Sequence, residues 1–97
     1  MKTYNYNGQK VYLKYTTYAN NGCLAVEMLS PDDEEYYDVI TVNLNNCMMQ
    51  GDTTAFVDTN NLPGIGKWLE RHGIAKPLGI YQQSGFCRYQ LYAFNNA

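Results

Sequence analysis

The stretch NNLPGIGKWLERHGI, residues 60–74, contains the helical segment of this sequence and sets its fold class. Leu62, Ile65 and Leu69 recur at the spacing of one helical face, and a stripe of this kind is typical of a helix that packs on a core. The periodicity ends before a glycine, so we expect one short α-helix at about residues 62–72.

Both ends of this expected helix carry recognisable signals. Asn60 or Asn61 is suited to the N-cap, because a short amide side chain can accept a bond from an orphan N–H group. Pro63 fits the first turn, where its missing N–H costs nothing. The Gly73-Ile74 pair predicts a Schellman stop, with glycine in the left-handed conformation.

Strand patterns surround the helix on both sides. Asn7-Gly8 between alternating residues predicts a type I′ hairpin turn, since this pair adopts positive φ values readily. Further strand-like runs are residues 10–18, 23–30, 36–44 and 54–59, and a closing hairpin is expected around Ser84-Gly85. We therefore predict an α+β fold, a mostly antiparallel twisted β-sheet with one short helix late in the chain, forming a single domain over residues 1–97.

The helix start resembles two nucleic-acid motifs. A phosphate loop needs glycine at position 61 and a hydroxyl at position 68, but Asn61 and Trp68 stand there, so we reject it. The stretch LPGIG (residues 62–66) also fits the turn of a helix-hairpin-helix module, which binds DNA phosphate with backbone N–H groups. The preceding TTAFVDTN, residues 53–60, is a poor first helix, and the acids before the turn would repel phosphate.

Charge is strongly segregated along the chain. The net charge is -2, yet no Lys or Arg lies between Lys14 and Lys67. The acids of that stretch sum to -8 and are Glu27, Asp32, Asp33, Glu34, Glu35, Asp38, Asp52 and Asp58. Both flanking segments sum to +3: three lysines up to Lys14, and four basic residues less Glu70 from Lys67 onward. This asymmetry is the most informative feature of the composition.

Several functional classes have little support. His72 lies at the expected helix end, where capping is the simpler role, and adjacent acids in a turn are normally solvated, so we expect no enzyme and no catalytic residue. Cys23, Cys47 and Cys87 lack ligand spacing, so neither a metal nor a cofactor is expected. The sequence has no membrane-spanning run or signal-peptide pattern, which leads us to expect a cytoplasmic protein that contacts no membrane.

The C-terminal part of the sequence, residues 55–95, resembles a family of small bacterial proteins known only as a domain of unknown function. Members of the family resemble accessory genes of conjugative elements and phages. The matching residues are Phe56, Asp58, Asn60, Asn61, Leu62, Pro63, Ser84, Gly85, Phe86, Tyr89 and Phe94. The resemblance implies a mobile-element setting and brings no catalytic residues.

In that setting, the acidic run suggests an inhibitor of a host defence nuclease, of anti-CRISPR or anti-restriction type. Its carboxylates would stand in for phosphates in a basic nucleic-acid-binding groove of a protein partner. The expected partner-binding residues are Asp32, Asp33, Glu34, Glu35, Tyr36, Tyr37 and Asp38, with the tyrosines as anchors. A solvated loop is the plain alternative for this run.

Two other functions stay open. Lys10, Lys14 and Arg88 lie among tyrosines, so a small nucleic-acid-binding face would exist if their strands were neighbours. The low overall basicity argues against nucleic acid as a partner. A structural or assembly role is the other alternative, and the sequence leaves the oligomeric state open.

Overall fold

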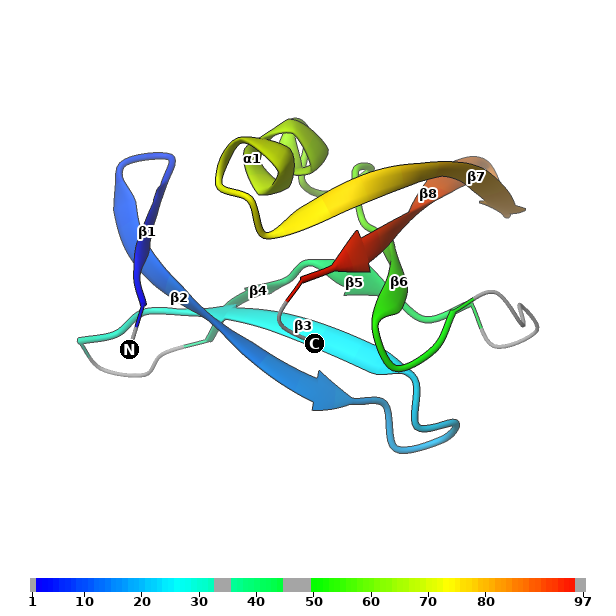
Figure 1. Ribbon diagram of the computed structural model, residues 1–97, viewed down its shortest axis with the longest axis horizontal. Coiled ribbons are helices and arrows are strands. Elements are labelled where there is room, and N and C mark those ends of the chain that lie inside the picture. Colours follow the sequence, from blue (N-terminus) through cyan, green and yellow to red (C-terminus); the bar gives the residue numbers. More distant parts are fainter. Residues whose placement is uncertain (1, 33–35, 45–49, 96–97) are drawn as a thin grey trace.

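Two four-stranded antiparallel sheets dominate the computed structural model, which describes residues 2–32, 36–44 and 50–95 (Figure 1). The first sheet has the order β1-β2-β3-β4 and the second the order β5-β6-β8-β7. The elements are β1 (Tyr4–Tyr6), β2 (Gln9–Thr17), β3 (Leu24–Leu29), β4 (Tyr36–Val39), β5 (Thr41–Val42), β6 (Thr54–Val57), α1 (Ile65–Arg71), β7 (Ala75–Ser84) and β8 (Cys87–Phe94). The predicted fold class is confirmed.

The run expected as one strand at residues 36–44 is divided between the two sheets at Ile40, which corrects the sequence-based prediction. The N–H of Ile40 donates to the Val26 carbonyl in the first sheet, at 2.9 Å. Its carbonyl accepts from the N–H of Asp58, which follows β6 in the second sheet, at 2.8 Å. Ile40 is completely buried, so this one residue joins the sheets through its backbone while its side chain fills the core.

The first hairpin turn is formed as predicted. Asn7 and Gly8 have φ values of 51° and 83°, as a type I′ turn requires, and Tyr6 pairs with Gln9 across it. The side-chain oxygen of Asn5 accepts a bond from the Gly8 N–H at 3.0 Å. At the other end of the chain, the two-residue loop of the β7–β8 hairpin is Gly85-Phe86, closed by Ser84 and Cys87.

The start of the helix differs from the prediction. Neither Asn60 nor Asn61 caps it: α1 begins at Ile65, after Gly64 with a φ of 84°. Asp58 organises the turn before it, because its carboxylate accepts the Asn61 N–H at 3.1 Å and its carbonyl accepts the next N–H, that of Leu62, at 3.0 Å. These bonds hold the chain in a separate turn ahead of the helix. The left-handed conformation of Gly64 separates this turn from the first residue of α1.

The end of the helix is the predicted Schellman stop. Gly73 has a φ of 67°, and its N–H donates to the Glu70 carbonyl at 3.0 Å. The N–H of Ile74 donates to the Leu69 carbonyl at 2.9 Å. Leu69 and Ile74 are both buried. β7 follows directly, so Pro77 lies inside that strand instead of ahead of it.

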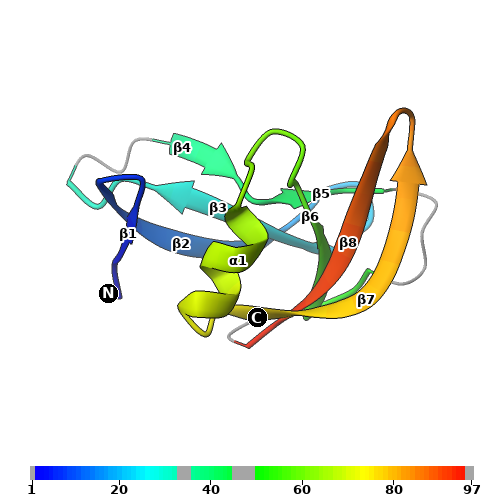
Figure 2. The same cartoon turned by 90° about the horizontal axis from the view of Figure 1, so that it is seen from above.

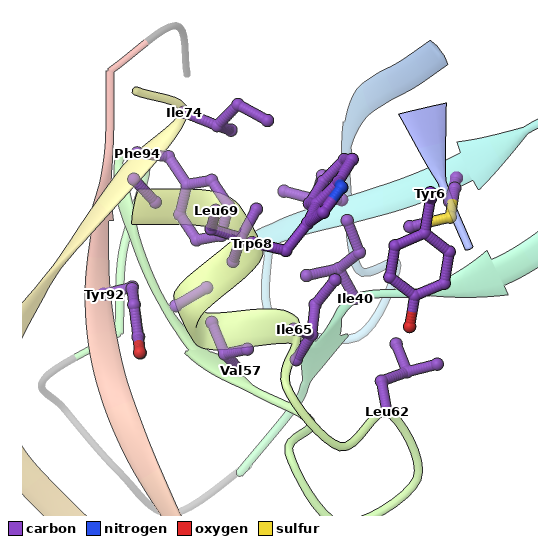
Figure 3. Close-up of a cluster of buried hydrophobic side chains, with 14 of the residues drawn as sticks. Tyr6, Ile40, Val57, Leu62, Ile65, Trp68, Leu69, Ile74, Tyr92 and Phe94 are labelled. Atoms are coloured by element: carbon purple, nitrogen blue, oxygen red, sulfur yellow. The ribbon is translucent and has the colours of Figure 1, made fainter. Parts of the chain in front are cut away.

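One hydrophobic cluster joins α1 to both sheets. Figure 3 shows Ile65, Trp68 and Leu69 of the helix between residues of the two sheets. The buried members are Tyr6, Val11, Leu24, Val26, Met28, Ile40, Ala55, Val57, Leu62, Ile65, Trp68, Leu69, Ile74, Ala75, Tyr92 and Phe94. The indole N–H of Trp68 donates to the Asn5 carbonyl at 2.8 Å, so the helix is fixed to β1 by a directional bond as well as by packing.

Candidate functional site

The described part of the expected partner-binding segment lies at the end of the molecule where β3 leads to β4 (Figure 2). Asp32 is exposed in the turn after β3, and Tyr37 and Asp38 belong to β4. Asp33, Glu34 and Glu35 lie outside the described residues, as does the side chain of Tyr36, whose backbone begins β4. We call Asp32, Tyr37 and Asp38 together the acidic–tyrosine surface.

Tyr37 is the exposed aromatic residue of this surface. Its side chain is 41 % exposed, and its ring meets that of Tyr6 edge to face, with 6.1 Å between centroids and 90° between planes. Tyr6 is only 6 % exposed and makes a second edge-to-face contact with Trp68, at 5.3 Å. The exposed ring is therefore supported from behind by a buried one that is itself anchored in the core.

The aromatic cluster extends further along the helix. Tyr4 lies edge-on to Trp68, with centroids 5.7 Å apart, and the His72 ring is 4.8 Å from Trp68 and 5.4 Å from Tyr4. The Lys2 ammonium lies 5.5 Å from the Tyr4 centroid. His72 is the C-cap residue, and its ring is a packing element between Tyr4 and Trp68.

Tyr6 contacts Tyr37 of the candidate site, and the sequence did not predict this contact. The alternation of Tyr4 and Tyr6 before Asn7-Gly8 was the available signal, but nothing in it indicated contact with residue 37. Burial, followed by the nearby Tyr37 and Asp38, raises the pKa of Tyr6 above its ordinary value of 10.0. The Tyr6 hydroxyl is therefore neutral at physiological pH, and the negative charge of this end belongs to the carboxylates.

The remaining described acids of the long acidic stretch lie on other elements, although Glu27 of β3 pairs with Val39 of β4. Asp58 is buried, and its carboxylate is bonded to the backbone and side chain of Asn61. Asp52 lies in the bend before β6, and Glu27 sits on β3 opposite Lys14 of β2. The described acids of the stretch are thus distributed over several elements; Asp38 adjoins Tyr37 on β4, and Asp32 lies in the turn between β3 and β4.

The proposed basic–aromatic face does not form. Lys10 and Lys14 are on β2 in the first sheet, whereas Arg88 is on β8 in the second, so their strands are not neighbours. The guanidinium carbon of Arg88 instead lies 4.2 Å from the ring centroid of Tyr81 on β7, its partner strand. The condition on which the nucleic-acid alternative depended is therefore not met.

The fold does not give LPGIG the setting of a helix-hairpin-helix module. The segment before it contains the strand β6, so there is no first helix for a helix-hairpin-helix module. Each glycine has a structural role: Gly64 supplies a positive φ, and Gly66 lies against Tyr92 of β8, where a side chain would overlap. Gly66 is therefore explained by packing against Tyr92, and phosphate binding is not needed to account for it.

The part of the chain that the structure describes holds no group of three or more His, Cys, Asp or Glu residues that could bind a metal ion. Cys23 and Cys87 are free and half-buried there. Within the same residues, no helix is long and apolar enough to cross a membrane.

Comparison with known proteins gives one match. The sequence model of a family described as "Domain of unknown function (DUF4313)" matches residues 12–97. No curated protein and no solved structure was found to match this sequence. The family match covers most of the chain, including β3, β4 and α1, so the chain belongs to this family.

Proposed function

We propose that this member of the DUF4313 family is a non-enzymatic interaction protein of a mobile genetic element, which inhibits a host defence nuclease of the CRISPR or restriction type. The acidic–tyrosine surface would occupy a basic nucleic-acid-binding groove of that nuclease. The mobile-element setting comes from the family resemblance of residues 55–95.

The exposed and supported ring of Tyr37 is the observation that carries the proposal. Interfaces concentrate their binding energy in a few aromatic or arginine anchors. An anchor binds more tightly when it is already held in place, because less side-chain freedom is lost on association. Tyr37 meets both conditions: it is 41 % exposed, and the buried Tyr6 restricts it from one side.

Asp38, which follows Tyr37 on β4, and Asp32 in the turn before β4 carry negative charge that would complement a basic groove. Asp32 is exposed, and Asp38 is half-buried with one oxygen accepting the Val39 N–H at 2.8 Å, which fixes its orientation. Asp33, Glu34 and Glu35 adjoin them in the sequence. A groove that binds phosphate would attract this surface at long range, and the attraction would weaken as salt is added.

The direct test is nuclease inhibition. Each CRISPR effector and restriction nuclease of the bacterium that carries the gene is purified, and its cleavage of target DNA is measured with increasing amounts of the protein. We expect one of them to lose activity at stoichiometric protein. If all of them cleave at their normal rates, the proposed function is wrong.

Matched variants locate the surface. Asp32→Lys should weaken inhibition about tenfold, whereas Asp52→Lys, which makes the same charge change at another exposed acid, should leave it unchanged. Tyr37→Ala should weaken inhibition at least as much, since a central anchor typically contributes about 2 kcal/mol or more. Equal effects of Asp32→Lys and Asp52→Lys would show that only net charge matters and would overturn the choice of surface.

A further inference from the structure

β7 is a long edge strand with an open side. It is the outermost strand of the order β5-β6-β8-β7, and no strand in the described residues pairs with its outer side. β7 has ten residues, whereas the other edge strands, β1, β4 and β5, have three, four and two. Short edge strands offer little for another chain to pair with, but a ten-residue edge is a template for strand addition.

The distal half of this edge lacks the usual protection. Residues 78–84, LGIYQQS, contain no charge and no proline, two common guards of an open edge. The irregularity of β7, a register shift between Pro77 and Tyr81 with Gly79 at a φ of 72°, leaves Tyr81 to Ser84 as its regular distal part. By contrast, the unpaired side of β2 carries the exposed Lys14. The β7 edge is therefore chemically open to a further strand.

Exposed apolar side chains gather on the same hairpin. Four large hydrophobic residues are exposed in the described part of the chain, and three of them, Leu78, Tyr81 and Phe86, belong to β7 or to its turn. The ring of Phe86 is fully exposed. β6 pairs only with Gln90 to Ala93 of β8, so the hairpin beyond that point is a two-stranded ribbon that extends from the molecule (Figure 2).

We propose that a second copy of this chain pairs with the outer edge of β7, strand against strand and antiparallel about a two-fold axis. Antiparallel pairing of one edge with itself is self-complementary, because each copy offers the same N–H and C=O pattern. Since residues 78–84 carry no charge, the two paired strands place no like charges opposite each other; the nearby cation is Arg88 of β8, one strand further in, which lies over the Tyr81 ring. The result is an eight-stranded sheet shared by two chains.

The available area sets the strength of this dimer. A weak interface buries about 600 Å² per partner, which is close to a tenth of the 5786 Å² surface of the chain. An interface made by one strand edge, with the exposed Leu78, Tyr81 and Phe86 on the same hairpin, belongs to this weak class. We expect a dissociation constant on the order of 10 µM.

The dimer would leave the acidic–tyrosine surface free. In both cartoon views, the tip of the β7–β8 hairpin and the β1 end of the molecule lie at opposite ends of the long axis (Figures 1 and 2). Two acidic–tyrosine surfaces would then face away from a central shared sheet. The proposed pairing is independent of the proposed function, and either can fail without the other.

Sedimentation equilibrium of the full chain tests the pairing. The mass should rise from the 11.1 kDa monomer toward twice that value between about 1 and 300 µM. Tyr81→Lys and Gln83→Lys place a charge on the edge and should each raise the dissociation constant at least tenfold. Thr59→Lys adds the same charge in an exposed turn and should change nothing. A monomer at every concentration, or an equal response to all three variants, would overturn the proposal.

Cysteine cross-linking tests the geometry. Single cysteines are placed at Leu78, Tyr81 or Gln83 in a chain whose own three cysteines are serine, with folding confirmed by circular dichroism. In an antiparallel pair, the distance between a residue and its copy in the partner grows by about 7 Å for each residue along the strand away from the two-fold axis. Disulfide yield should therefore be high at one position and lower at the others. Equal yields at all three positions indicate parallel pairing and contradict the proposal, as does the absence of cross-links.

Discussion

A Cβ atom at Gly66 would overlap the hydroxyl oxygen of Tyr92 and would lie 3.2 Å from its Cζ. This contact brings the first turn of α1 directly onto β8, and both residues are buried. It explains why glycine is required inside the helix, where it is otherwise unfavourable by roughly 1 kcal/mol relative to alanine.

Gly66→Ala is predicted to lower the free energy of unfolding by about 1–2 kcal/mol, because overpacking against the buried Tyr92 outweighs the better helix propensity. Urea denaturation followed by Trp68 fluorescence measures the change. Gly51→Ala is the matched control, since a Cβ there meets only Thr54 Oγ1 at an ordinary 3.7 Å.

A double-mutant cycle isolates this contact. Tyr92→Phe removes the oxygen that a Cβ at residue 66 would overlap, so Gly66→Ala should cost about 1 kcal/mol less in the Tyr92→Phe chain. If the two substitutions are additive, close packing between them is not the reason for the glycine.

Asp58→Ala is predicted to destabilise the fold by about 1–2 kcal/mol, since it leaves the Asn61 N–H without its acceptor in the turn before α1. Asp58→Asn keeps one side-chain oxygen and should cost less. Thermal unfolding of the two variants provides the comparison. If Asp58→Ala proves no more harmful than Asp58→Asn, the carboxylate does not organise this turn.

Tyr18 links stability to alkaline pH. Its hydroxyl is bonded to the backbone oxygen and to Oγ1 of Thr41, at 3.1 and 2.9 Å, and burial raises its pKa above 10.0 although the Thr41 bond opposes the shift. Above pH 10 the unfolded chain releases this proton before the folded chain does. The stabilisation is therefore complete below pH 10 and is lost as pH rises through the folded-state pKa.

The matching experiment compares the natural chain with Tyr18→Phe by urea denaturation from pH 8 to pH 11. We expect the variant to be less stable by about 1 kcal/mol at pH 8, because a hydrogen bond is lost. The difference should shrink above pH 10. A difference that stays constant or widens at alkaline pH would contradict this role for Tyr18.

Local signals were predicted well from the sequence. Asn7-Gly8 specified its turn and Gly73-Ile74 specified the end of the helix, because each depends on φ values that few other residues adopt. The burial of Leu62, Ile65 and Leu69 was likewise correctly predicted, but only Ile65 and Leu69 owe it to helical periodicity, because Leu62 lies in the turn before Gly64.

Features that depend on distant parts of the chain were not predictable in this way. Ile40 continues a regular strand pattern, and only the position of Asp58 shows that its backbone joins two sheets. The need for glycine at position 66 is explained only by Tyr92 of β8, which follows the helix in the sequence after β7 and packs against it. The contact between Tyr6 and Tyr37 is of the same kind, because both residues are ordinary strand residues until the strands are placed.

The acidic–tyrosine surface is proposed to occupy the DNA-binding groove of a defence nuclease, and a competition titration tests this most directly. Fluorescent target DNA is first bound to the nuclease that the protein inhibits. The natural protein, the Tyr37→Ala variant or the Asp52→Lys variant is then added at low and at high salt. We predict that the natural protein and Asp52→Lys release the DNA, that Tyr37→Ala needs at least tenfold more protein, and that all become weaker at high salt. Inhibition of cleavage while the DNA stays bound, or equal release by Tyr37→Ala, would contradict the claim.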